Sequence, residues 1–371
     1  MKKSLVTLAG LAFVGVASAQ SSVTLWGLLD ADVSHYSQGG RSRTMESTSG
    51  NSGSQLGFRG TEDLGGGLSA NFWLESSLLN NTGGGLGGAL TFNRRSTVSL
   101  SSGFGEVRLG RDYTPSFLNH VVFDPFGDSG PGAGSNITLG GGANGLAGSN
   151  GLTAVRANNS LQYLWGFAPN ALATVGSGVY AQLMYALPGN VSGTPALGEY
   201  TGGRLGYANG PMNAAISYSQ SKGAPYAADA AQGDSTFKEF NLGGSYKLGV
   251  ARLMAHVGTN NSDVAGTRYT HWSVGATIDA GPAYIPIAFT SVKQNNATSD
   301  GANQFAAGYV YVLSKRTSVY VTVSHITNKN NGTYTFQGSN GGGNPGIETA
   351  FGSGTSFGSG TGYDIGLKTS F

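Results

Sequence analysis

Few residues of this 371-residue chain have the types and spacing that catalysis requires. Residues 354–358 (GTSFG) fit the G-x-S-x-G pattern of a serine nucleophile, but they stand in a Gly- and Ser-rich stretch without the strand and helix that such a turn needs. No cysteine is present, which excludes disulfides and cysteine-based metal sites. Five histidines are scattered along the chain: His35, His120, His256, His271 and His325. They lack the spacing of a metal motif, so we expect each to face water or a rim, and we expect no enzyme.

Charged side chains also occur on segments in which polar and apolar residues alternate with a period of two. Such charges can set the electrostatic potential of a water-filled space. In the segment VTLWGLLDADVSHY, Leu29 and Val33 share one face, and Asp30 and Asp32 share the opposite face. The same alternation places three arginines among polar neighbours: Arg59, Arg108 and Arg156. For the adjacent pair Arg94 and Arg95, parity favours Arg95. A charge at the lipid face of a membrane strand costs about 2–4 kcal/mol, so we expect these charges to face an aqueous interior.

The elements that must position these charges are strands of alternating polarity, about sixteen in number, which continue to Phe371. Short turns alternate with long loops rich in Gly, Asn and Ser, as in a barrel with a turn rim and a loop rim. The long stretch 112–156 has no sustained period, and we expect it to fold into the hollow of the barrel. The sequence therefore predicts an all-β fold, a 16-stranded antiparallel transmembrane β-barrel. One departure is Pro286, which lacks a ladder donor within a predicted strand.

Composition and the N-terminus agree with an exported membrane protein. Gly accounts for 63 residues and charged residues for only 11%. Lys2 and Lys3, an apolar run and the small residues 17–19 predict a signal peptide over residues 1–19, followed by a barrel domain over 20–371. Loss of the two lysines lowers Lys+Arg from 21 to 19, against 19 acidic residues, so the mature chain is formally neutral. Nucleic acid is therefore not an expected partner.

Four features together resemble the general diffusion porins of the Gram-negative outer membrane: the blocks SSVTLWGLLD, LGFRGTEDLGGGLSANFWLE and FGEVRLGRDYTP, and the terminal Phe371. The resemblance implies passive diffusion of ions and small hydrophilic solutes through a homotrimer in outer-membrane lipid. It also implies a third extracellular loop folded inside each barrel, with no cofactor and no metal. The resemblance implies a wall of arginines at Arg59, Arg94 and Arg156, so Arg94 stays a candidate beside Arg95. This wall faces acids on the loop, where FDPFGD is similar to the family motif. Gln55 departs from that pattern, because the family usually has Arg there.

The combined expectation for the constriction has a basic and an acidic side. The basic side consists of Arg59, Arg94, Arg95, Arg108, Arg156 and Gln55, and the acidic side of Asp124, Asp128, Glu75, Asp30 and Asp32. Opposed charges create a transverse field, and their balance predicts a mild anion preference at most. Two alternatives are a substrate-specific channel or adhesin, and a barrel hydrolase. The hydrolase requires a Ser/His or Asp/His cluster at one rim, which the scattered histidines do not suggest.

Overall fold

Alternating burial along each strand sets the architecture. In β1 (Ser22–Gln38), the apolar side chains of Leu25, Leu29 and Val33 are exposed, whereas Asp30 is buried. This is the reverse of a water-soluble sheet, and the exposed apolar face suits the hydrocarbon of a membrane. The polar face then looks into the space that the strands enclose.

The computed structural model describes residues 22–85, 89–138, 155–171, 175–189, 198–223, 235–262, 268–336 and 358–371. The predicted signal peptide and most of the GTSFG stretch lie outside these ranges. The strands that follow β1 are β2 (Arg41–Thr48), β3 (Gln55–Gly65), β4 (Leu68–Ser77), β5 (Arg95–Ser102), β6 (Gly105–Tyr113), β7 (Arg156–Trp165), β8 (Gly178–Ala186), β9 (Tyr200–Asn209), β10 (Met212–Gly223), β11 (Ser235–Leu248), β12 (Ala251–Ser262), β13 (Arg268–Ala280), β14 (Ala283–Gln294), β15 (Gly301–Val312), β16 (Thr317–Lys329) and β17 (Gly360–Ser370). Two helices, α1 (Pro115–Val122) and α2 (Ser135–Thr138), lie between β6 and β7.

A single antiparallel sheet closes on itself through its first and last strands. β17 pairs with β1 from Leu28 opposite Ser370 to Gln38 opposite Gly360. The backbones of Gly27 and Phe371 exchange two hydrogen bonds, of 3.2 and 3.0 Å. A Cβ on Gly27 would lie only 2.3 Å from the Phe371 ring, so a glycine there lets the terminal aromatic cover the seam. Closure leaves no open edge to face lipid.

The 17 strand segments of the described residues make 16 barrel strands. β1 pairs with β2 from Ala31 to Gln38 and with β3 from Ser22 to Leu28, so β2 and β3 share one position in the wall. The predicted 16-stranded antiparallel barrel is therefore confirmed. Residues 49–54, between β2 and β3, leave the wall and turn inward, which the sequence pattern did not reveal.

Pro286 lies where the ladder between two strands is interrupted. β14 pairs with β15 at Tyr284 and again at Ile287, and no pairing is registered between them on that side. Pro lacks an N–H donor, so the gap falls where a donor is missing. On its other side Pro286 stays in register with Thr277 of β13.

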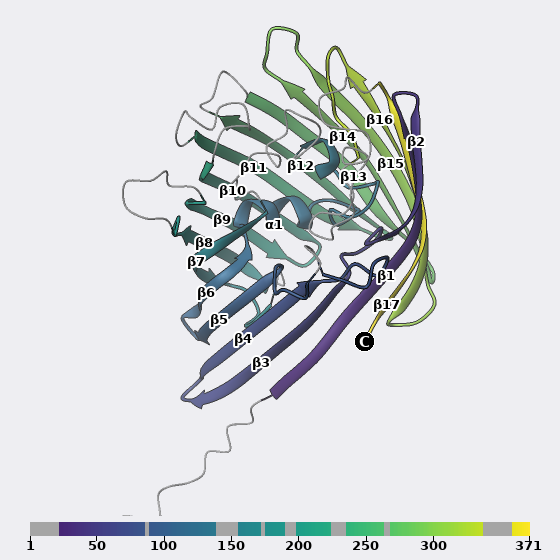
Figure 1. Ribbon diagram of the computed structural model, residues 1–371. Coiled ribbons are helices and arrows are strands. Elements are labelled where there is room, and N and C mark those ends of the chain that lie inside the picture. The colour runs from purple at the N-terminus through teal and green to yellow at the C-terminus, as the bar shows by residue number, and fades with distance from the viewer. Residues whose placement is uncertain are drawn as a thin grey trace, which may run out of the picture.

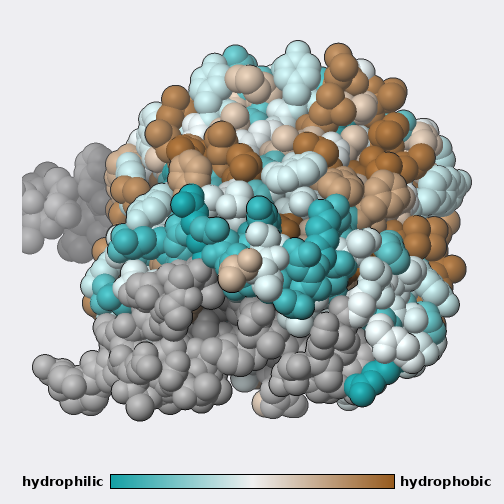
Figure 2. Space-filling view, turned by 90° about the horizontal axis from the view of Figure 1, so that it is seen from above, coloured by the Kyte–Doolittle hydropathy of each residue, from teal (hydrophilic) through white to brown (hydrophobic). Residues whose placement is uncertain are grey.

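The ribbon curls around the segment that carries α1 (Figure 1). Apolar side chains spread over one side of the molecule as seen from above, and a band of polar side chains crosses the middle of that view (Figure 2). No helix in the described part of the chain is long and apolar enough to cross a membrane.

Candidate functional site

The inward segment between β6 and β7 is fastened to the barrel wall by its helix. α1 follows Thr114, whose side-chain oxygen accepts a hydrogen bond from the N–H of Phe117. Midway along α1, the Asn119 amide donates to the Ala215 carbonyl of β10 (3.1 Å) and to Asn241 Oδ1 of β11 (2.6 Å). Three strands thus hold one side chain, because Arg204 Nε of β9 donates to Asn119 Oδ1 (3.0 Å).

Beyond α1 the chain crosses toward the later strands. A Cβ on Gly275 of β13 would lie 2.7 Å from Cγ of Pro125, so the absence of a side chain at Gly275 leaves room for the Pro125 ring. Gln304 of β15 donates from Nε2 to the carbonyls of Pro131 (3.2 Å) and Ala133 (3.0 Å). The described part of the predicted loop, residues 114–138, therefore contacts the wall from β9 to β15 and occupies part of the space inside it.

One side of the lumen carries the arginines selected from the sequence. Arg94 pairs with Glu75, whose second oxygen accepts a hydrogen bond from the indole N–H of Trp73 (2.9 Å). Arg94 Nη2 also donates to the Tyr113 hydroxyl (2.9 Å). Arg156 lies over the Tyr113 ring, 4.1 Å from its centroid, and donates to the same hydroxyl. Tyr113 thus joins Arg94, just before β5, to Arg156, the first residue of β7.

Both members of the Arg94–Arg95 pair face the lumen. Arg95 begins β5 and follows its inward parity, with a fully buried side chain. Arg94 precedes the strand, where strict alternation no longer holds, and it is 7% exposed. Parity could not place Arg94 for this reason.

Arg95 and Arg108 form a buried ion-pair cluster with two acids that sequence reasoning did not select. Arg108 contacts Asp112 (2.7 Å) and Glu106 (3.0 Å), and Arg95 Nε lies 3.5 Å from Asp112. The Ala171 carbonyl, in the connection between β7 and β8, accepts a further hydrogen bond from Arg108 (3.2 Å). Because both arginines are buried and paired with acids, we expect them to hold the wall together rather than to attract ions in the lumen.

Arg59 contrasts with that cluster. Its side chain is exposed and lies over the indole of Trp73, 5.3 Å from the ring centroid, on the lumen side of β3. Gln55, at the start of β3, is half-buried on the same face. None of the ion pairs found among the described residues involves Arg59 or Arg156. Among the arginines predicted for the basic side, Arg59 and Arg156 are therefore the two without an ion pair in the described part of the chain.

The acids of the inward segment face the later strands. Asp124 and Asp128 line a small pocket with His120, His256 and Thr290. The Asp124 carboxylate accepts hydrogen bonds from the backbone N–H groups of Phe126 (3.1 Å), Asp128 (3.0 Å) and Gly134 (3.3 Å). Burial, reinforced by the neighbouring Asp128 carboxylate, raises the pKa of Asp124 to about 7. Asp124 is therefore partly protonated near neutral pH, which lowers the negative charge that the loop contributes.

Three other predicted acids, Glu75, Asp30 and Asp32, lie on the barrel wall, where each is paired or buried. Glu75 forms an ion pair with Arg94, so it adds no free negative charge to the lumen. Asp30 Oδ2 accepts from the backbone N–H groups of Asn51 (2.9 Å) and Ser52 (2.6 Å) of the inward residues 49–54. Asp32 accepts from the hydroxyls of Ser34 and Ser47. Both aspartates face inward as parity predicted, but they are buried rather than open to the lumen.

Two further basic residues face the lumen and were missed. Arg204, opposite in parity to the exposed Leu205, is buried against Tyr180 and Asn119. Lys368 of β17 donates to Asn51 Oδ1 (2.5 Å). The alternation of polar and apolar residues along β9 and β17 could have predicted that both side chains point inward.

The expectation that all histidines face water or a rim is wrong for three of them. His120, His256 and His271 are buried and lie together inside the barrel. Val257 and Trp272 are exposed on the outer face, so alternation along their strands could have predicted that the neighbouring His256 and His271 point inward. No local signal could have joined them to His120, because that contact depends on the path of the inward segment.

A match to the family model described as Gram-negative porin spans residues 5–331. Outer membrane porin protein 32 of Delftia acidovorans is 38% identical over 348 residues, which cover 91% of this chain and 93% of that protein. An anion-selective porin from Comamonas acidovorans has a similar solved structure, with a TM-score of 0.79, 33% identity and coverage of 95% of this chain and 100% of that one. OmpT of Vibrio cholerae, described as a trimer form, shares the fold at a TM-score of 0.65 and 14% identity, with coverage of 95% and 99%.

Proposed function

This chain belongs to the Gram-negative porin family, a family of outer-membrane channels rather than enzymes, and on that premise we propose that its pore prefers anions. In this proposal the arginine side of β3 to β7 forms the basic wall, and residues 114–138 form the constriction opposite it. Ions and small hydrophilic solutes cross by diffusion down their gradients.

The observation that carries the proposal is an imbalance of unpaired charge. Arg59 is exposed and, like the half-buried Arg156, joins none of the ion pairs among the described residues, whereas Asp30, Asp32 and Asp128 are buried and Asp124 is partly protonated near neutral pH. Fixed charge that is not neutralised raises the local concentration of counter-ions, which here are anions. The similar porin from Comamonas acidovorans is described as anion-selective, which supports the same sign.

The field in the bore has a direction as well as a sign. Positive guanidinium groups stand on one side, and the polar inward segment stands on the other. Such a field orients water and favours dipolar solutes over apolar ones, which must displace that ordered water. A general porin of this kind filters by size and polarity and holds no substrate tightly.

Processing and assembly belong to the same proposal. Residues 1–19 are removed as a signal peptide, and residues 20–371 form the barrel domain, with the constriction loop over about 112–156. The mature chains assemble as a homotrimer, in line with the trimer form described for the OmpT fold relative.

The reversal potential of folded protein in a planar bilayer, under a KCl gradient, tests this proposal. We expect the sign that corresponds to anion preference. Arg316→Gln, which removes an exposed charge next to the turn between β15 and β16, is the matched control and leaves the value unchanged. A reversal potential of cationic sign would refute the anion preference, and saturation of conductance by one solute would favour a substrate-specific channel.

A further inference from the structure

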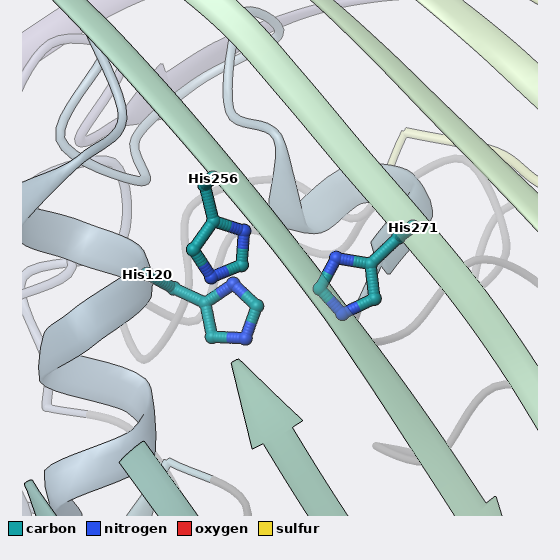
Figure 3. A group of neighbouring side chains, drawn as sticks. All are labelled: His120, His256 and His271. Carbon is teal, nitrogen blue, oxygen red and sulfur yellow. The ribbon is translucent and has the colours of Figure 1, made fainter. Parts of the chain in front are cut away.

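Three histidines from three different elements meet inside the barrel. His120 comes from α1 of the inward segment, His256 from β12 and His271 from β13 (Figure 3). Their ring centroids are 4.2 Å apart for His120 and His256, 5.3 Å for His120 and His271, and 5.2 Å for His256 and His271. One nitrogen from each ring can be chosen so that all three lie within 4.8 Å of one another.

The buried nitrogens of this cluster lack the hydrogen bonds that burial normally demands. His271 is fully buried, and neither its Nδ1 nor its Nε2 has a hydrogen-bond partner among the residues that the structure describes. The same part of the chain offers no partner to the buried Nε2 of His256. A neutral imidazole has one N–H donor and one acceptor nitrogen, and each group left unsatisfied costs about 1–3 kcal/mol. Such exceptions in a folded protein call for a ligand or another explanation.

The backbone makes room for this arrangement. Gly258 lies directly opposite His271 in the pairing of β12 with β13. A Cβ at Gly258 would lie 2.6 Å from both Cε1 and Nε2 of His271. Any other residue there would push the His271 ring away from its present position.

We propose that His120, His256 and His271 form a binding site for a divalent transition-metal ion such as Zn²⁺. Imidazole nitrogens suit Zn²⁺, Cu²⁺ and Ni²⁺, whereas Mg²⁺ and Ca²⁺ prefer oxygen ligands. Zn–N bonds of about 2.0–2.1 Å in tetrahedral geometry place ligand nitrogens about 3.3 Å apart, so the rings must close by about 1.5 Å. Rotation of the side chains supplies that movement, and water takes the fourth position.

A carboxylate is already in place to orient one ligand. Glu239 Oε1 of β11 lies 2.7 Å from His120 Nε2, which leaves Nδ1 as the His120 nitrogen that binds the metal. Metal-bound histidines commonly hold a carboxylate through their second nitrogen, and the carboxylate fixes the tautomer and strengthens the ligand. The donor set is thus three imidazoles with one supporting acid.

Metal binding here would tie the inward segment to the wall. His120 belongs to α1, whereas His256 and His271 belong to neighbouring wall strands. A bound ion therefore adds a cross-link beside the direct contacts of α1 with β9 to β11. We expect bound Zn²⁺ to reduce fluctuations of the open-channel current, because the segment inside the bore loses freedom to move.

Zn²⁺ titration by calorimetry, on folded protein stripped with a chelator, tests the site. We expect one ion per chain, and about 10- to 100-fold weaker binding for Glu239→Gln, with at least that loss for His256→Ala and His271→Ala. His325→Ala, which removes an exposed histidine on β16, is the matched control and keeps wild-type affinity. Gly258→Ala retains all three histidines, and we expect it to weaken binding because it displaces one ring.

Substitution of Co²⁺ supplies a readout that needs no variant to fold. Wild-type protein with one Co²⁺ per chain should show the strong visible absorption of a tetrahedral nitrogen site. No Zn²⁺ binding, equal binding by wild type and His271→Ala, or a weak octahedral Co²⁺ spectrum would each overturn the proposal. Conductance in metal-free buffer is measured in parallel, so failure of the metal site is distinguished from failure of the channel.

Discussion

Replacing Arg59 by Gln should weaken anion preference without disturbing the barrel. The Arg59 side chain is exposed to the lumen, forms none of the ion pairs found in the described part of the chain, and lies over the Trp73 indole. Gln keeps a polar side chain of moderate length in the same place. The change therefore removes one charge and little packing.

The expected magnitude follows from Coulomb's law in water. An anion that passes about 5 Å from the guanidinium gains about 0.8 kcal/mol, and screening at about 0.1 M salt lowers this to about 0.5 kcal/mol. That energy raises the local anion concentration about twofold and lowers the cation concentration by a similar factor. Loss of Arg59 should then lower the anion-to-cation permeability ratio about two- to fivefold, with the smaller value for paths farther from the wall.

The assay is the reversal potential of single channels under a KCl gradient, measured at low and high salt. The difference between wild type and Arg59→Gln should shrink at 1 M salt, where the Debye length is about 3 Å. Arg316→Gln at the turn rim again serves as control. A folded Arg59→Gln channel with the wild-type permeability ratio at low salt would show that Arg59 lies away from the ion path, and would refute this reasoning.

Three further outcomes are expected. Asp112→Asn leaves Arg95 and Arg108 buried with less compensating negative charge. We expect the free energy of unfolding, measured by urea titration of the refolded barrel, to fall by about 3–5 kcal/mol. A fall below about 1 kcal/mol would show that these ion pairs do not stabilise the barrel. Asn119→Ala removes the side chain that holds α1 to three strands, so we expect noisier single-channel currents and a free energy of unfolding lower by about 1–3 kcal/mol. An unchanged current trace would show that other contacts are enough to hold α1 in place. The pKa of Asp124 is raised from 3.8 to about 7, so this carboxyl is neutral below that pH and negative above it; anion preference should therefore fall as pH rises from 6 to 8, and a matching fall in Asp124→Asn would exclude Asp124 as its source.

The wall of the barrel could be read from the sequence because side-chain direction in a strand is a local property. Successive side chains point to opposite faces, so Leu29 and Asp30 are separated by the backbone alone. The same rule placed Arg108 inside the barrel, where it is buried. It does not account for Arg156, because the alternation shifts between Ala157 and Ser160, and Arg156 is held by its contact with Tyr113. It failed for Arg94, which precedes its strand, and for residues 49–54, where one barrel strand is broken into β2 and β3.

The contacts within the lumen could not be read in this way. Glu75 pairs with Arg94 because the two lie side by side where β4 and β5 meet, with the Arg94 N–H donating to the Glu75 carbonyl (3.1 Å). Asp124 turns toward the later strands because backbone N–H groups of its own loop hold its carboxylate. The family resemblance assigned Asp124 to the loop and strand alternation assigned Glu75 to the wall, but only the path of the chain shows which partner each acid reaches.

The sequence by itself determined a closed barrel with charged side chains facing water, since period, turn spacing and the cost of charge in lipid are all local matters. The tertiary structure alone decided which of those charges remain unpaired and which imidazoles meet. His120 approaches His256 and His271 only because residues 114–138 cross the bore and Gly258 leaves space for a ring. Such contacts depend on strand register and loop path together, and no short stretch of the chain encodes either one.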